Sequence, residues 1–370
     1  MSKRKEKMTK NLLDIYSDYL IAQNKYATST GLSDLLDGKI SHDKITGFLN
    51  KNNFTSKDLW SYVKTKIREI QQEKGGILII DDFIQEKPYT DENEITAWYY
   101  SHAKHRSIKG VNIISSMIRY NDTAFPINYE IIKKDISISC NIKTKQIKRK
   151  SSISKNEPLR SMLSQIEKNN IFYDYVLADV WYGSKKNMSF IHNKLNKKFI
   201  FGIKANRLVW LLDTKGQHQN IKDLNIKEKQ KMIVTLKDLS FPVALIKKTF
   251  INEDQSTGTL YLVTNDLNLD ADQIYTIYQK RWIIEDYHKS TKQNASLAKS
   301  PTKVIRSQSN HIFASIIAYC KLEFLKLKTS LNHFALKYSL LVKANRACFI
   351  ELNNLQKKLI LRKVSYILKI

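Results

Sequence analysis

The sequence predicts an α/β fold in which helices cover a mixed β-sheet. Two features carry this prediction: strand-like apolar runs alternate with amphipathic helical segments from Gly75 onward, and the first run, "GGILIIDD", stops abruptly at two aspartates. The 370 residues suffice for two domains, or for one large domain with an insertion. With only 10 Gly and 5 Pro among them, long flexible linkers are not expected.

The first part of the chain, residues 1–70, is expected to form a helical domain. "TGLSDLLDG" and "SHDKITGFLNKN" predict two short helices joined by a turn at Gly38, with Ser41 capping the second helix. Such a pair is typical of a helix-turn-helix that reads DNA. The alternative is a plain helical bundle that packs on the next domain.

The middle of the chain predicts an α/β core. "GGILIIDD", "GVNIISSMIRYND" and "FPINYEIIKK" are expected to be three strands. A helix ("EPLRSMLSQIEKNN"), a buried strand ("YDYVLADV"), a second helix ("GSKKNMSFIHNKLNKK") and a last strand ("KFIFGIK") follow. Three strands, helix, strand, helix, strand is the order of an RNase H-like core. We assign residues 75–203 and 259–295 to this core.

Three further segments complete the predicted organisation. Residues 204–258 are expected to be an inserted β-rich piece. Residues 300–370 are expected to be a C-terminal helical region whose first helix begins at Ser300 and Pro301. The basic stretch 141–158 is poor in bulky apolar residues, so an exposed loop is expected there.

Charge and composition indicate the partner. The chain carries 62 Lys and Arg against 35 Asp and Glu, and its net charge of +27 is spread along its length, which favours nucleic acid through counterion release. A membrane is not expected, because no apolar run approaches the ~18–20 residues of a span. Asp14 and Asp18 also interrupt what would be the apolar part of a signal peptide. Three scattered cysteines argue against a disulfide framework and indicate a reducing, cytoplasmic compartment.

The stretch "YQKRWIIEDYHKSTK" places four polar residues along one side of a predicted helix. At ~100° per residue they fall within an arc of roughly 60°: Tyr278, Arg281, Glu285 and Lys292. A tyrosine, two cations and a carboxylate in a row would suit a polyanion with a metal ion beside it. The alternative is an exposed helix face with ion pairs such as Arg281 with Glu285.

Acidic residues are scarce in this chain, so their positions are informative. Asp81 and Asp82 are expected to end the first strand, and Asp179 to end the strand beside it. Together with Glu285, carboxylates at this edge of the sheet could hold two divalent metal ions about 4 Å apart, which suits displacement at a phosphodiester. Because side chains alternate along a strand, Asp81 and Asp82 face opposite ways, and we favour Asp81 as the ligand. The alternative for each aspartate is a turn or helix-capping residue.

The order Asp, Asp, Glu resembles the DDE transposases of bacterial insertion sequences. The four residues of the stripe match, without a gap, the Y-R-E-K signature of the cut-and-paste subgroup, the insertion sequence four type. "DDFIQEKPYTDEN" and "LADVWYGS" resemble the first-Asp and second-Asp segments, and the resemblance covers residues 75–330. Phe83 departs from the family, which often has Thr there, and this leaves open a defective element copy.

The resemblance implies a role for each candidate residue. The catalytic residues would be Asp81, Asp82, Asp179 and Glu285. Asp81, Asp179 and Glu285 would bind two Mg²⁺ or Mn²⁺ ions. The DNA contacts would be Tyr278 to the transferred strand, Arg281 and Lys292 to phosphates, and Trp210 to a flipped base. For Trp210 the alternative is a core tryptophan of the insertion.

The resemblance also implies partners and a reaction. Double-stranded DNA, as element ends and as target, would be bound by a homodimer on paired ends, in a nucleoid-associated, cytoplasmic location in a bacterium. The reaction would be nicking, hairpin formation, reopening and joining. Two alternatives stay open: an RNase H-like nuclease that cuts without joining, and a transposase-derived DNA-binding protein without catalytic activity.

Overall fold

The computed structural model describes residues 3–101, 104–141, 146–211, 217–252 and 254–367. The chain divides into two compact units. The helical unit contains Met1–Phe48, Ser290–Pro301 and Ala314–Ile370. The sheet unit contains Leu49–Lys289 and Thr302–Phe313. None of the helices in the described ranges combines the length and the apolar content needed to cross a membrane.

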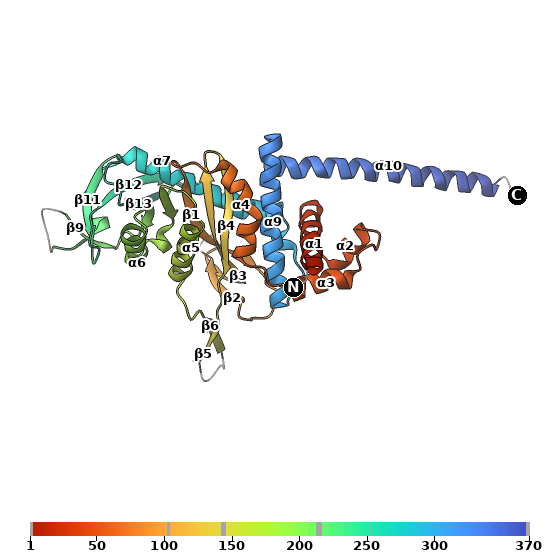
Figure 1. The fold of residues 1–370 in the computed structure, drawn as a ribbon, viewed down its shortest axis with the longest axis horizontal. Helices are drawn as coiled ribbons and strands as arrows, with labels where there is room; N and C mark the ends of the chain where they lie inside the picture. The colour runs from red at the N-terminus through yellow and green to blue at the C-terminus, as the bar shows by residue number, and fades with distance from the viewer. Residues whose placement is uncertain (1–2, 102–103, 142–145, 212–216, 253, 368–370) are drawn as a thin grey trace. The chain divides into compact units, whose positions relative to one another are not determined.

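The sheet unit is built on one large mixed sheet (Figure 1). Its strands follow the order β10-β9-β11-β12-β13-β8-β7-β1-β3-β2, and β4 pairs with β3. Their bounds are β1 Ile77–Glu86, β2 Thr96–Ser101, β3 Arg106–Tyr120, β4 Thr123–Ile131, β7 Tyr175–Ala178, β8 Lys198–Ile203, β9 Leu208–Leu211, β10 Gln219–Asn220, β11 Lys231–Leu236, β12 Val243–Ile251 and β13 Thr257–Thr264.

The core of this sheet contains the predicted strands and helices in their order, with an additional strand, β2, between β1 and β3 in the chain that was not predicted. β1 pairs antiparallel with β3 and parallel with β7, and β8 pairs parallel with β7. Helix α5 (Asn156–Lys168) precedes β7, and the short helix α6 (Lys185–Ser189) precedes β8. The first four residues of β1 are all buried, as expected for a central strand between two neighbours.

The first strand does not end at the two aspartates, as the sequence suggested. β1 continues to Glu86, and its pairing with β3 includes Asp81 opposite Ser115 and Asp82 opposite Ile114. Only the pairing with β7 stops at Ile80. The long partner β3 supplies backbone hydrogen bonds beyond that point, so β1 remains a strand after β7 has ended.

The segment predicted as an insertion is rich in strands but does not form a separate layer. β13 pairs antiparallel with β8, with Thr264 opposite Ile200, and β12, β11, β9 and β10 follow outward in the same sheet. The segment therefore widens the core sheet. Hydrogen bonding to the open edge of β8 explains this, because an edge strand presents unpaired backbone groups.

Two segments differ from the prediction. Part of the expected loop 141–158 is a hairpin of β5 (Ile136–Asn141) and β6 (Gln146–Lys150), while residues 142–145 lie outside the described ranges. Helix α4 (Ser56–Ile70) belongs to the sheet unit rather than to a domain ending at residue 70. Its buried side chains Leu59, Val63 and Ile67 and the hydrogen bonds of Ser56 with Tyr129 of β4 attach it there.

The helical unit contains α1 (Lys3–Ala22), α2 (Ser29–Leu35), most of α3 (His42–Lys51), and parts of α8 (Ile283–Gln293) and α9 (Ile305–Thr329), together with α10 (His333–Ile367). The side chain of Thr28 caps α2 by accepting a hydrogen bond from Gly31 N. Lys337 of α10 donates to the backbone oxygens of Ile21 and Gln23 at the end of α1, and so attaches α10 to this unit.

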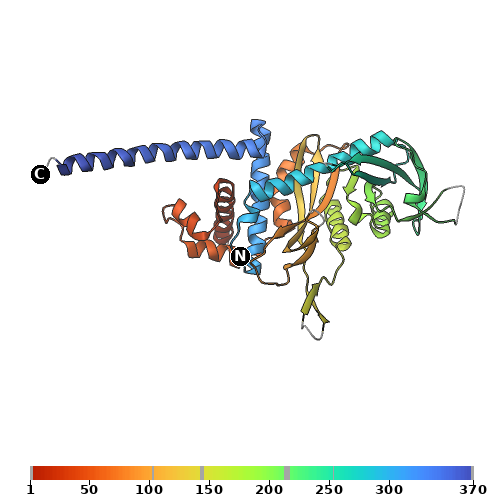
Figure 2. The same ribbon diagram turned by 180° about the vertical axis from the view of Figure 1, so that it is seen from behind.

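Helix α9 begins later than the sequence suggested. Pro301 does not open it; the first hydrogen bond of the helix runs from Gln308 N to Val304 O, and Ser300 has an extended backbone. Figure 2 shows α9 and α10 from behind.

Candidate active site

Parallel pairing of β1 with β7 brings two aspartates together. Ile80 lies opposite Ala178, the last residue of β7, and the next residues along the two strands are Asp81 and Asp179. Both residues directly follow the last parallel pair, so both carboxylates lie at the end of the sheet where β7 stops. The Asp179 side chain also caps the 3₁₀ turn Val180–Tyr182, accepting a hydrogen bond from Trp181 N at 2.9 Å.

The third carboxylate reaches this edge from a helical arm. The arm is not the single helix that the sequence suggested: α7 (Ala271–Gln279) and α8 are separated by a 3₁₀ turn, Lys280–Trp282. From this turn the Arg281 Nη1 atom contacts Asp81 Oδ2 at 2.6 Å and Glu285 Oε1 at 3.5 Å. Because both oxygens contact one nitrogen, they lie within about 6 Å of each other.

The electrostatics of this group show an excess of negative charge. Burial, followed by the nearby Asp179 carboxylate, raises the pKa of Asp81 to about 8, although Arg281 opposes the shift. Burial raises the pKa of Asp179 as well. The pKa of Glu285 is lowered, through its contacts with His288 and Arg281. Arg281 therefore compensates only part of the charge of these carboxylates.

Asp82 points to the other face of the sheet and has different neighbours. Its carboxylate accepts hydrogen bonds from Asn112 Nδ2 at 2.8 Å, Lys155 Nζ at 2.7 Å and Tyr182 OH at 2.7 Å. Burial alone would raise the pKa of Asp82, but the Lys155 ammonium and these hydrogen bonds lower it. Its oxygens thus accept hydrogen bonds from protein donors, and Asp81 is the aspartate that shares the Arg281 guanidinium with Glu285.

Sequence reasoning missed the role of Lys155, Asn112 and Tyr182. Tyr182 follows shortly after Asp179 in the chain, so its bond to Asp82 connects the strand that carries Asp81 with the turn that carries Asp179. Lys155 lies at the start of α5 and connects the same carboxylate to that helix. Lys155 and Asn112 lie in no quoted motif. Tyr182 lies in "LADVWYGS", but nothing in that segment indicates a partner 100 positions away in the chain.

The remaining predicted residues are placed differently. Tyr278 is buried, with a pKa raised to about 12 mainly by burial, and its hydroxyl lies near Gly202 rather than on the surface. Lys292 lies further along α8, in the segment that belongs to the helical unit. Trp210 is half-buried on β9, edge-on to His218, and five strands separate β9 from β1. The structure therefore does not bring Trp210 to the carboxylates.

Two other tryptophans lie next to the carboxylates in the chain and are exposed. Trp181 is 58% exposed and has the Lys204 ammonium 5.0 Å from its ring centre, and Trp282 is 65% exposed beside Arg281. Phe83 is buried with its ring centre 4.3 Å from that of His288 on α8. It therefore packs the helical arm against β1.

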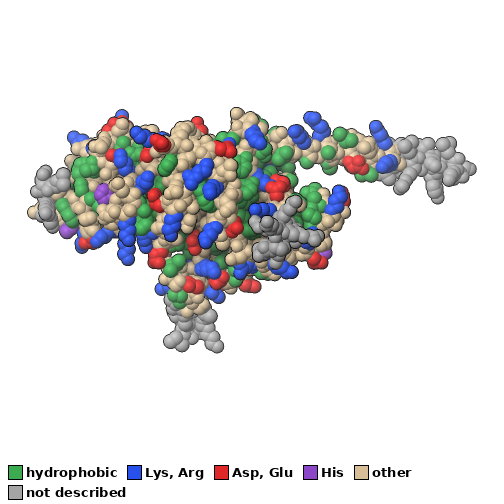
Figure 3. Space-filling model, viewed as in Figure 1, with side chains coloured by type: hydrophobic (Ala, Val, Ile, Leu, Met, Phe, Trp, Pro, Cys, Tyr) green, Lys and Arg blue, Asp and Glu red, His purple; other side chains and the backbone are tan. Residues whose placement is uncertain are grey.

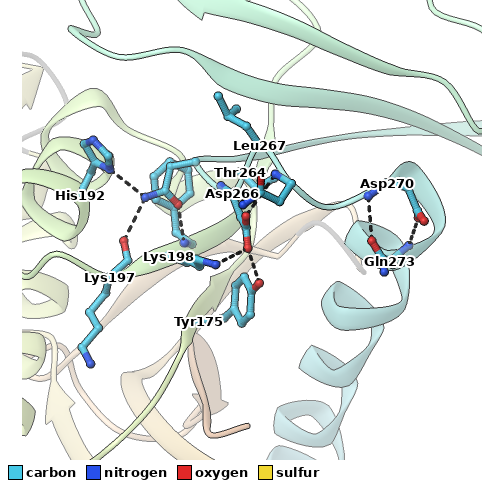
Figure 4. A network of polar contacts seen from close by, with 12 residues as sticks. Tyr175, His192, Lys197, Lys198, Thr264, Asp266, Leu267, Asp270 and Gln273 are labelled. Carbon is cyan, nitrogen blue, oxygen red and sulfur yellow. Dashed lines mark hydrogen bonds and ion pairs between the residues drawn. The ribbon is translucent and has the colours of Figure 1, made fainter. Parts of the chain in front are cut away.

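A second polar network supports the start of the arm (Figure 4). Asp266, just after β13, accepts hydrogen bonds from Tyr175 OH at 2.5 Å and Lys198 Nζ at 2.6 Å, which lie at the beginnings of β7 and β8. Asp270 then caps α7 by accepting from Gln273 N, and the Gln273 side chain accepts from Asp270 N. The approach of the arm is thus fixed at the end of the sheet away from the carboxylates.

The carboxylates of the site are candidate ligands of a divalent metal ion. Across the residues described, no three His, Cys, Asp or Glu side chains are already grouped closely enough to hold one. The chemistry of the site nevertheless fits Mg²⁺ or Mn²⁺: Asp81, Asp179 and Glu285 offer only hard oxygen ligands, and burial and mutual repulsion raise the pKa of Asp81. A bound cation would relieve that repulsion. It would replace Arg281 as the partner of the carboxylates.

Comparison with known proteins shows the family of this chain. The model of the DDE superfamily endonucleases matches residues 3–220, more than half of the chain, and the model of the transposase DDE domain matches residues 141–321. The chain belongs to the DDE superfamily of endonucleases. Its matches support a DDE transposase within that superfamily.

Other comparisons add little. No curated protein matches the chain. Among solved structures, the Drosophila P element transposase strand transfer complex matches at 8% identity and a TM-score of 0.27, too low to support an argument about fold or function. The match covers 51% of this chain and 36% of that one, so this chain spans about a third of the length of that relative.

Proposed function

We propose that this chain is the transposase of a bacterial insertion sequence of the insertion sequence four type, and that it moves its element by cutting and joining DNA. The observation that carries the proposal is that Asp81 and Asp179 directly follow the last paired residues of adjacent parallel strands, while Arg281 contacts both Asp81 and Glu285. The three carboxylates have the chain order Asp, Asp, Glu. Family membership gives the endonuclease chemistry. The Y-R-E-K spacing supports the assignment to the insertion sequence four type.

The topology supports an RNase H-like core. The strand order β4-β3-β1-β7-β8, with β3 antiparallel and β7 and β8 parallel, is the arrangement expected for that core. The helical arm supplies Glu285 after the widened part of the sheet. In this proposal the part of residues 1–70 that lies in the helical unit, Met1–Phe48, recognises the element end. Residues 75–203 and 259–295 perform the chemistry, and residues 300–370 support the assembly.

The proposed reaction assigns separate tasks to the site residues. Two Mg²⁺ or Mn²⁺ ions held by Asp81, Asp179 and Glu285 would supply Lewis-acid stabilisation at a phosphodiester. Arg281 would release a carboxylate and contact a DNA phosphate instead, and Lys292 would contact a second phosphate. Tyr278 would support the arm close to the transferred strand. Hydrolysis would free a 3′-hydroxyl, which would attack the opposite strand to form a hairpin that water reopens before joining.

Charge supports double-stranded DNA as the partner. Lys and Arg side chains are spread over the face shown in Figure 3 rather than gathered on one element. With a net charge of +27, binding is expected to weaken steeply as salt rises. A homodimer is part of the proposal, because two element ends must be held together during excision.

The test uses DNA that carries the flanks of the gene, with Mg²⁺ or Mn²⁺. Glu285→Gln is expected to abolish nicking while DNA binding is retained, because the carboxylate is lost and the shape is kept. The matched control is Asp286→Asn, which removes the adjacent, exposed carboxylate of the same helix and should nick like the wild type.

The outcomes separate the proposal from its two alternatives. Nicking by Glu285→Gln at the wild-type rate would remove Glu285 from the site. Wild-type nicking without joining would identify a nuclease. Specific binding by the wild type with neither step would identify a transposase-derived DNA-binding protein.

A further inference from the structure

Helix α10 of the helical unit carries apolar side chains into solvent. All residues from 342 to 358 are exposed. They include Phe349, Leu352 and Leu355, which are 67%, 49% and 49% exposed. Figure 3 shows hydrophobic side chains along this helix between Lys and Arg. Contiguous exposed apolar surface of this kind is typical of an interaction site.

The apolar residues of α10 are spaced as in a coiled coil. Six of them, counting one Asn, alternate steps of three and four residues: Tyr338, Leu341, Asn345, Cys348, Leu352 and Leu355. We call these six residues the α10 seam. At ~100° per residue they fall within an arc of roughly 100°, along about 26 Å of helix. Steps of three and four are the a and d positions of a heptad repeat.

No charged residue between Tyr338 and Leu355 lies within this arc. Between Tyr338 and Leu355 the charged residues are Lys343, Arg346 and Glu351, and their angular positions all fall outside the seam. Val342 and Phe349 widen its apolar side. DNA is therefore a poor occupant, because it would require cations on the contacting face.

We propose that the α10 seam binds the same seam of a second copy of this chain, as a parallel, in-register coiled coil. Asn345 occupies an a position in the middle of the seam. In a parallel, in-register pair it meets Asn345 of the second copy, and the two amides satisfy each other. An antiparallel pair would set Asn345 against an apolar d residue, and a lipid surface would offer the amide no partner.

The same register sets Cys348 against its equivalent in the second copy. Cys348 is a free, exposed thiol, whereas Cys320 is buried. The α10 seam supplies an interface for the homodimer that is part of the proposed function, and the inference rests on that proposal in this respect. Its test needs no DNA, however, so its failure would leave the proposed chemistry standing.

The first experiment measures the oligomeric state of the full chain without DNA, by sedimentation equilibrium over a range of micromolar concentrations. The wild type is expected to form dimers, and Leu352→Lys to weaken self-association at least tenfold. The matched control is Ile350→Lys, since Ile350 is 57% exposed on the same helix but lies outside the seam. Circular dichroism confirms that each variant is folded.

The second experiment determines the orientation with a short bis-maleimide in a Cys140→Ser background. Cys348 is expected to cross-link. Leu341→Cys and Leu355→Cys, each combined with Cys348→Ser, should both cross-link, because equivalent d positions meet along the whole length of a parallel pair. Asn354→Cys with Cys348→Ser, on the opposite side of the helix, should not.

Four results would overturn the proposal. They are a monomeric wild type at every concentration, equal dimerisation by Leu352→Lys, and absence of cross-linking at position 341, at position 355 or at both, which indicates that the helices are not parallel and in register. The fourth is binding of a monomeric wild type to phosphatidylglycerol vesicles that Leu352→Lys abolishes, which would identify a lipid surface as the occupant.

Discussion

The two neighbouring aspartates of β1 should respond in opposite ways to the same substitution. Asp82→Asn removes a carboxylate that accepts hydrogen bonds from Lys155, Asn112 and Tyr182. Asp81→Asn removes a buried carboxylate whose pKa is raised to about 8. The first change therefore removes favourable interactions of the charged form, and the second removes a charge that is costly to bury.

The magnitude for Asp82 follows from its hydrogen bonds. A hydrogen bond to a charged group contributes about 1.5–3 kcal/mol. Losing the charged contact with Lys155 alone should lower the melting temperature by roughly 3–12 °C, since ~1 kcal/mol corresponds to ~2–4 °C for a unit of this size. Catalysis should fall as well, because Tyr182 and the turn that carries Asp179 lose their anchor.

For Asp81 the sign follows from the raised pKa. Its protonated form is favoured in the folded state, so the stabilisation is full below the ordinary value of 3.8 and is lost as pH rises towards about 8. Without metal ions, Asp81→Asn should thus be at least as stable as the wild type at low pH. It should become the more stable of the two as pH approaches 8.

The assay is thermal melting of the wild type and both variants in EDTA between pH 5 and pH 9, repeated with Mn²⁺. Mn²⁺ should stabilise the wild type and Asp82→Asn but not Asp81→Asn. If Mn²⁺ instead stabilised Asp81→Asn but not Asp82→Asn, the metal ligand would be Asp82 rather than Asp81. A melting difference that does not change with pH would refute the electrostatic reasoning.

Three further predictions concern DNA. Arg281→Ala should slow hairpin formation and joining on pre-nicked end DNA by roughly one to two orders of magnitude, measured as a time course; an unchanged yield would return Arg281 to a purely structural role. Lys292→Ala should slow the same steps to a similar degree, with first-strand nicking affected less; equal slowing of all steps would contradict a phosphate contact in the later steps. Lys44→Ala, on the exposed side of α3, should weaken end binding and reduce its salt slope by about one, whereas an unchanged slope would argue against α3 as the DNA-reading helix.

Much of the sheet was predictable because its strands are strongly apolar and short. The order from β1 to β8 follows from runs such as "GGILIIDD" and "YDYVLADV", which have no competing helical period. The attachment of β13 to β8 was not predictable, because periodicity shows that a segment is a strand but not which edge it joins. The same limit applies to α4, whose partner β4 is about 70 residues away.

The candidate site was predictable at the level of residue types but not of contacts. Strand alternation predicts that Asp81 and Asp82 face opposite ways, and in the structure they have different partners, Arg281 and Lys155. Those partners could not be predicted from the sequence. The helix rule placed Arg281 on an exposed stripe. The 3₁₀ turn at Lys280–Trp282 and the attraction of two carboxylates instead hold its guanidinium inside the site.

The pairing of β13 with β8 has a consequence for how this chain can change over time. The arm that carries Glu285 departs from β13, which is hydrogen-bonded directly to the core strand β8, while β12, β11, β9 and β10 lie further out. Strands can therefore be gained or lost at the outer edge without shifting the third carboxylate relative to the two aspartates. Length variation is expected to concentrate between β8 and β12, while the arrangement of the three acidic residues stays constant.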